Sequence, residues 1–188
     1  QISSKNIMIN YGVYLAVASI LVNLIFYATG TLISLGWLIG IIGIVLMIGI
    51  ISFGIKKYKE ANNGLLSWGQ AVKIGIGISI LSGLIAVIYG FIFNNYIDPT
   101  MQEQIMDIQR QAWADANMTS EQIEAAEEMT KRFSSPAISS AIQIVASAFF
   151  GFIISAIAGA VISTIPMIPI SSLHFSQFNF LCNWNTNK

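Results

Sequence analysis

Side chains that could act as nucleophiles, general bases or metal ligands are scarce in this chain. Its 188 residues include one histidine, His174, and one cysteine, Cys182. One imidazole cannot form a histidine cluster, and one thiol excludes an internal disulfide and a multi-cysteine metal site. The motifs of zinc proteases, serine hydrolases and phosphate-binding loops are absent from the sequence, and no histidine is placed to activate a serine. We therefore expect no catalytic, cofactor-binding or metal-binding residue, and a protein that is not an enzyme.

Carboxylates gather in one segment, residues 98–132, which holds eight acidic side chains and three basic ones. Its apolar residues recur at helical spacing on both sides of a break at 117–118, which predicts two amphipathic helices. Glu124, Glu127 and Glu128 share one helix face, a pattern able to bind a divalent cation or a basic partner. No calcium-loop pattern accompanies them. We favour the alternative, a hairpin folded back on a membrane domain with its acidic face in water.

Two amides, Asn23 and Gln143, are the polar groups that lie deepest in otherwise apolar runs. Such amides commonly form interhelical hydrogen bonds, each worth about 1 kcal/mol. A transport or proton-relay site more often carries an ionisable residue at mid-membrane. These two residues therefore favour a structural role, with a small-solute transporter or channel component as the alternative.

The elements that must position these residues are four apolar runs, at 7–29, 31–55, 72–96 and 137–165. Each exceeds the roughly 20 residues that a helix needs to cross a bilayer, and none has a polar face. Charged residues make up only 10% of the chain, against about 25% in soluble proteins. The sequence predicts an all-α, polytopic membrane protein. Its four transmembrane helices are joined, between the third and fourth, by an extracytoplasmic amphipathic helical segment.

The predicted organisation has four parts. Residues 1–96 hold the first three transmembrane helices, with a cytoplasmic basic loop at 56–71. Residues 97–136 form the extracytoplasmic acidic helical segment, and residues 137–165 the fourth transmembrane helix. Residues 166–188 contain two prolines near their start and show no periodicity, so we expect an irregular tail, foreign to the rest of the sequence or tied to a partner.

Three lysines set the expected orientation. Lys56, Lys57 and Lys59 follow the second run, and basic loops lie on the cytoplasmic side of a membrane. With four spans, both termini are then cytoplasmic and segment 97–136 faces the periplasm. The expected location is a bacterial inner membrane.

Two helix starts carry capping signals. Ser67 and Gln70 have the spacing of a capping box before the third helix, with Trp68 at the membrane interface. Asp98 followed by Pro99 predicts an N-cap and a first helical residue, so that a new helix starts outside the membrane.

Small residues recur at every fourth position of the fourth run. These are Ser147, Gly151, Ser155, Gly159 and Ser163, and the third run has a weaker copy in Gly75, Ser79 and Gly83. Such stripes let helices approach closely in lipid, where packing drives association. We expect them to pack the helices of one chain together, with homodimerisation through the fourth helix as the alternative.

Three stretches resemble a known family. They are KKYKE at 56–60, GLLSWGQAVKIG at 64–75 and YIDP at 96–99. Together with the order hairpin, basic loop, third span, acidic segment and fourth span, they are similar to the bacterial membrane proteins catalogued as domain of unknown function 4199, abundant in Bacteroidetes. The resemblance covers about residues 7–163 and implies an inner-membrane protein of a Gram-negative bacterium with no assigned activity. It supplies no catalytic residue.

The sequence as a whole favours a non-enzymatic accessory or scaffold subunit that acts by helix packing and an external helical surface. Its expected partners are membrane lipid and a second copy or another membrane protein, bound through the fourth helix or segment 97–136. A net charge of zero argues against a nucleic-acid partner.

Overall fold

A computed structural model describes residues 3–165 of the chain, and within this range every regular element is a helix. The elements are α1 (Ser4–Ala28), α2 (Gly36–Ala61), α3 (Trp68–Ile92), the π-helix η1 (Phe93–Ile97), α4 (Met101–Asp115), α5 (Ser120–Phe133) and α6 (Pro136–Thr164). In the described range four helices are long and apolar enough to span a membrane: α1, α2, α3 with η1, and α6. The predicted all-α, four-span fold is confirmed. The expected tail, with His174 and Cys182, lies outside the described residues.

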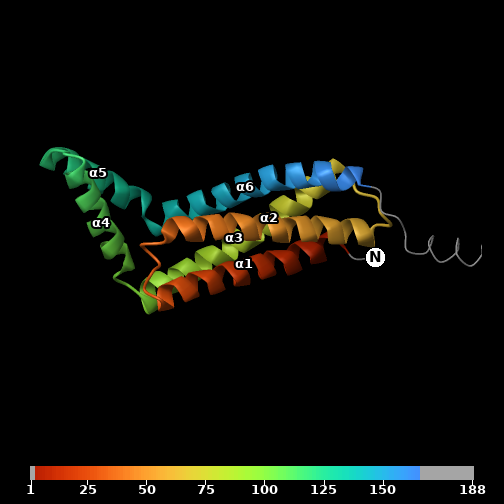
Figure 1. Ribbon diagram of the computed structural model, residues 1–188, viewed down its shortest axis with the longest axis horizontal. Helices are drawn as coiled ribbons and strands as arrows, with labels where there is room; N and C mark the ends of the chain where they lie inside the picture. The colour runs from red at the N-terminus through yellow and green to blue at the C-terminus, as the bar shows by residue number, and fades with distance from the viewer. Residues whose placement is uncertain (1–2, 166–188) are drawn as a thin grey trace, which may run out of the picture.

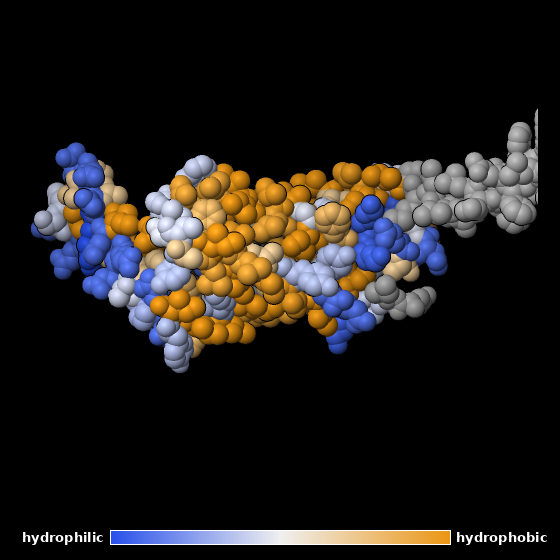
Figure 2. Space-filling model, turned by 60° about the horizontal axis from the view of Figure 1, so that its bottom comes forward, coloured by the Kyte–Doolittle hydropathy of each residue, from blue (hydrophilic) through white to orange (hydrophobic). Residues whose placement is uncertain are grey.

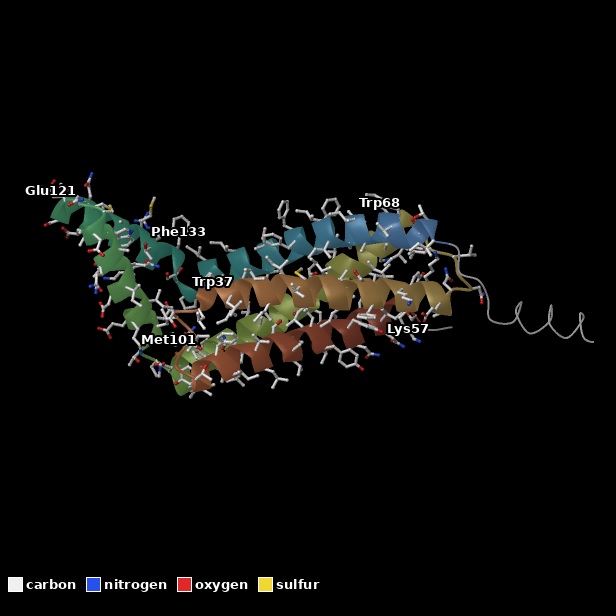
Figure 3. The ribbon with its side chains drawn as sticks, in the orientation of Figure 1. Trp37, Lys57, Trp68, Met101, Glu121 and Phe133 are labelled. Carbon is white, nitrogen blue, oxygen red and sulfur yellow. The ribbon has the colours of Figure 1, made fainter. Side chains whose placement is uncertain are left out.

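The four spans form one bundle around α3, which packs most extensively against α6 and α1, while α2 contacts all three other spans. Figure 1 shows α4 and α5 running across one end of this bundle rather than along it. We call this the hairpin end. Lys57 and Trp68 lie at the opposite end, the lysine end (Figure 3).

The core is concentrated in the half of the bundle nearer the lysine end. Ile51, Ile55, Ile74 and Ile78 are at most 1% exposed there. Outward-facing side chains of the spans are also apolar, such as Val45 at 62% and Phe149 at 59% exposure. Figure 2 shows them as a hydrophobic belt between hydrophilic ends. A belt of this extent fits hydrocarbon rather than water.

The second span begins and ends later than the sequence predicts. Residues 29–35 form turns before Gly36, and the Thr29 hydroxyl donates 3.1 Å hydrogen bonds to the Ile25 and Phe26 carbonyls. At the other end α2 continues to Ala61, so the three lysines lie on its last turns and not in a loop. The helix stops where Asn63 and Gly64 adopt positive φ angles of 54° and 81°, a left-handed ending that these two residue types tolerate.

The start of α4 corrects the prediction for Asp98 and Pro99. The helix begins at Met101, with Thr100 as its N-cap. Asp98 lies two residues before that cap, and its carboxylate accepts hydrogen bonds from the Thr100 backbone N–H at 3.1 Å and the Thr100 hydroxyl at 2.7 Å. This local turn competes with helix and takes up the residues expected in its first turn.

The third span starts with the expected geometry. The Gln70 N–H donates to the Ser67 hydroxyl at 3.3 Å, and the Ser67 N–H donates to the Gln70 side-chain oxygen at 3.0 Å. The box fixes where α3 enters the bundle, and the Trp68 indole then donates a 3.1 Å bond to the Ala156 carbonyl of α6.

Candidate functional site

The two small-residue stripes lie face to face, on α3 and α6. The closest glycine contacts pair Ala71 with Gly159, Gly75 with Ser155, Ser79 with Gly151, and Gly83 with Ser147. A Cβ atom added at Gly159 would lie 2.6 Å from the Ala71 Cβ, and one at Gly83 would lie 2.5 Å from the Ser147 hydroxyl oxygen. The contacts repeat every four residues along two antiparallel helices, which is the close approach that small side chains allow.

These serines act through their size. Ser79, Ser147 and Ser155 each donate to a carbonyl of their own helix, at 2.9, 2.9 and 3.1 Å. Ser163 lies beyond the last paired contact and donates to the Ala160 carbonyl at 3.1 Å. From Ser147 to Gly159 the stripe of α6 therefore packs against α3 of the same chain.

Lys59 has a role that the sequence analysis missed. Its side chain is only 3% exposed, and its ammonium donates to the carbonyls of Ile162 at 2.6 Å and Ile165 at 2.7 Å. The last carbonyls of a helix have no partner within it and carry partial negative charge. Lys59 thus caps α6 from α2, while Lys56 and Lys57 stay exposed. A signal was present, since Lys59 continues the buried row Ile51 and Ile55 at four-residue spacing.

The strongest candidate site is a cavity of about 630 Å³ at the hairpin end, which we call the vestibule. All four spans and the first turns of α4 contribute to its lining. Met101 of α4, which is only 7% exposed, belongs to that lining and lies at this end of the bundle (Figure 3). None of the described residues that line it is charged. Its polar lining consists of amides and hydroxyls: Ser19, Asn23, Tyr89, Asn94, Gln102 and Gln143.

Both predicted intramembrane amides lie in the vestibule wall. The Tyr89 hydroxyl of α3 donates a 2.7 Å hydrogen bond to the Asn23 side-chain oxygen of α1. Within the described residues, no protein acceptor takes the Asn23 amide hydrogens, and the side chain of Gln143, an exposed residue, makes no hydrogen bond to protein. Two amide groups with free capacity therefore line the same cavity from different helices.

A π-turn shapes the vestibule edge. In η1 the Asp98 N–H donates to the Phe93 carbonyl at 2.9 Å, the five-residue spacing of a π-helix. Phe93 is 5% exposed and packs edge-on against Tyr27, with ring centroids 5.0 Å apart. This anchored turn adds Asn94 to the lining. π-Helical turns often occur at functional sites. No pattern in the sequence around Phe93 predicted this one.

The vestibule narrows toward the middle of the bundle. A smaller cavity of about 130 Å³ shares Ser19, Ala86 and Gln143 with it and reaches Ser82 and Ser147. Beyond that depth come the fully buried isoleucines of the core. In the described residues the vestibule therefore ends within the bundle, before the lysine end.

The α4–α5 hairpin is held by a charged cluster. Arg110 of α4 donates to both carboxylate oxygens of Glu127, at 2.8 and 2.5 Å, and to Asp107 at 2.6 Å. These bonds raise the pKa of Arg110. They lower the pKa of Glu127 to about 2, chiefly through Arg110 and then through Lys131. Glu128 instead faces Arg132 at 3.8 Å, so the glutamates of α5 do not converge on one point.

Together, these features describe a recess that could hold a ligand. The vestibule offers hydrogen-bond donors and acceptors in a partly apolar recess of ligand-binding size. Its lining has no pairing of a nucleophile with a base.

Comparison with known proteins agrees with the resemblance seen in the sequence. Residues 10–164 match the family described as "Protein of unknown function (DUF4199)". No curated protein and no solved structure matches the chain. Because the family match spans most of the chain and all four membrane helices, the protein belongs to the DUF4199 family of proteins of unknown function.

Proposed function

We propose that this protein is a non-enzymatic inner-membrane protein that binds a small uncharged polar molecule in its vestibule, as one component of a solute transport system. The observation that carries this proposal is the vestibule itself, a recess of about 630 Å³ lined by amides and hydroxyls from several helices. Within a membrane, polar groups are normally buried against one another. Here Gln143 and the Asn23 amide hydrogens are left for a ligand.

The charge of the lining favours an uncharged ligand. A buried ion without a counter-charge loses its hydration and gains little in return. The described lining has neither a carboxylate nor a basic group, so sugars, polyols, amides and ureas suit it better than ions do.

The membrane orientation that the lysines predict supports entry of a ligand from outside the cell. Lys56 and Lys57 are exposed at the lysine end, which the positive-inside rule assigns to the cytoplasm. Both termini are then cytoplasmic, and the α4–α5 hairpin lies in the periplasm of a bacterium. A ligand would enter beside α4.

Binding can be measured on the full chain in phosphatidylcholine nanodiscs, by equilibrium dialysis with radiolabelled glycerol, urea and glucose. We expect at least one solute to bind, and Gln143→Leu to weaken it about tenfold, the effect of one hydrogen bond. Gln111→Leu, an exposed amide on α4, is the matched control. If no solute in the panel distinguishes Gln143→Leu from Gln111→Leu, the proposal is wrong.

A second candidate function is that of an accessory or scaffold subunit, acting through the hairpin. It is favoured by exposed apolar side chains on α4 and α5, with Ile108 at 49%, Met129 at 63% and Phe133 at 53% exposure. The partner would be a second copy or another membrane protein. Pull-down from mild detergent tests it, and a strictly monomeric protein without a co-purifying partner would contradict it.

A further inference from the structure

A second cavity lies beside the vestibule, between α5 and the start of α6. It measures about 540 Å³, and its lining includes the apolar side chains of Trp113, Met129, Phe133 and Ile142. We call it the α5–α6 groove. Apolar surface of this kind is stabilised by an apolar occupant, so these side chains suit a stretch of hydrocarbon chain better than a compact polar solute.

Gln143 is a lining residue of both cavities, the vestibule and the α5–α6 groove. Its neighbour Ile142 belongs only to the groove. At this point of α6 an uncharged polar recess and an apolar recess therefore share one wall residue, an arrangement that suits a molecule with a polar end and an apolar end.

The groove is continuous with the lipid-facing surface of α6. Ile138, Ile142, Val145 and Phe149 are 39–68% exposed and continue from the groove along the helix. Phe133 lies where α5 meets the bundle (Figure 3), at the depth where a span reaches the headgroup region of the bilayer. A lipid of the adjacent leaflet can enter the groove without leaving the membrane.

The acidic charge of segment 98–132 disfavours lipids with anionic headgroups. Segment 98–132, which covers both cavities, has eight acidic side chains and three basic ones. Two of those basic side chains, Lys131 and Arg132, already face Glu127 and Glu128. An anionic phosphate headgroup would therefore meet a repulsive surface with no free cation in a described position beside the groove.

We propose that the vestibule and the α5–α6 groove form one binding site for a membrane lipid with an uncharged polar headgroup. The headgroup hydrogen-bonds to Asn23 and Gln143 in the vestibule, and the acyl chain lies against Trp113, Phe133 and Ile142. This inference rests on the proposed function and names its ligand class. The acyl chain of such a lipid would reach the groove from the bilayer, and its uncharged headgroup would occupy the vestibule in the way the proposed function assigns to a small polar molecule.

The test uses a monoacylglycerol with a photoreactive diazirine in its acyl chain, added to the full chain in phosphatidylcholine nanodiscs. Cross-links are located by mass spectrometry. We expect labelling at residues 113 and 129–142, and about a fivefold loss in Phe133→Gln. Phe149→Gln is the matched control, because Phe149 is similarly exposed on α6 but does not line the groove. Ile142→Gln tests the same wall if Phe133→Gln does not fold.

Glycerol, the headgroup alone, separates this inference from the proposed function. We expect the acylated probe to bind at least about 100-fold more tightly than glycerol, because buried methylenes add binding energy. Labelling spread evenly over the lipid-facing helices, with Phe133→Gln equal to Phe149→Gln, would overturn the lipid site. The proposed function would still stand if glycerol binding depended on Gln143, and both would fail if neither probe responded to Gln143→Leu.

Discussion

The ammonium of Lys59 lies 2.6 Å from the carbonyl oxygen of Ile162, which is 103 residues away in the sequence. The contact joins the end of α2 to the end of α6. A lysine that the positive-inside rule predicts on the cytoplasmic side thus also satisfies the helix terminus beside it. This contact and the α3–α6 stripe contact hold the lysine-end half of the bundle closed beneath the vestibule.

Removing the Lys59 charge should loosen this end of the bundle. In Lys59→Met the aliphatic part of the side chain is kept, but the α6 carbonyls lose their donor, at a cost of about 1.5–3 kcal/mol for a charged hydrogen bond. We expect a lower melting temperature in detergent. Lys56→Met, at an exposed position near the same end of α2, should melt at the same temperature as the wild type. Equal melting of all three proteins would contradict the capping role.

Because the contacts between α3 and α6 are specific to residue pairs, a second substitution should restore the stability that a first one removes. A Cβ at Gly151 clashes with the side chain of Ser79, so Gly151→Ala should destabilise the bundle by about 1–3 kcal/mol. Gly151→Leu and Gly159→Leu should be worse and disrupt folding, with Ala148→Leu milder. Adding Ser79→Gly to Gly151→Ala should restore most of the lost stability, measured by thermal unfolding, because the double variant removes the clash.

The mismatched double variant, Gly151→Ala with Ser147→Gly, is the control for that rescue. Ser147 contacts Gly83 rather than Gly151, so its replacement leaves the clash in place. Equal rescue by both serine substitutions would show that the pairing described between the stripes is wrong.

Features fixed by local chemistry could be predicted from the sequence. Charge-free runs predicted the spans because length and hydropathy decide membrane residence, and the capping box at Ser67 needs only its own turn. The start of α4 was predicted too early, because Asp98 forms an Asx-type turn with Thr100 that precedes the first helical residue. The vestibule could not be predicted, because it depends on the angles between helices that bring Asn23 and Gln143 to one cavity.

Water in the vestibule can be detected by thiol labelling. Ser19→Cys, in a chain whose only native cysteine is replaced by Cys182→Ser, places a thiol in the vestibule lining. We expect it to react with a membrane-impermeant maleimide added to spheroplasts, because the proposed orientation places the hairpin end, and with it the vestibule, on the outer side of the membrane. Ser52→Cys, which lines an apolar groove between α2 and α6 nearer the lysine end, should stay unlabelled. Labelling of Ser19→Cys only after permeabilisation would reverse the orientation.

The Arg110–Glu127 ion pair predicts a pH-dependent hairpin. Hydrogen bonds first from Arg110 and then from Lys131 lower the pKa of Glu127 from 4.5 to about 2. In a separated hairpin this carboxyl titrates near its ordinary value, so between pH 4.5 and 2 the separated state binds more protons than the closed state. The stabilisation by Glu127 is therefore complete above this range and is lost as the pH falls through it. Protection of the α4 and α5 amides against hydrogen exchange, relative to an unstructured chain at the same pH, should fall across the range, while protection of the α3–α6 contact stays high. In Glu127→Gln these amides should be weakly protected at every pH, and the pH dependence should be lost. Glu128→Gln, at a 78% exposed side chain 3.8 Å from Arg132, should behave like the wild type.

Ligand binding should weaken over the same pH range, because Met101 and Gln102 of α4 line the vestibule and opening of the hairpin would displace them. Binding that is constant down to pH 2 would show that the hairpin is not needed to hold the ligand.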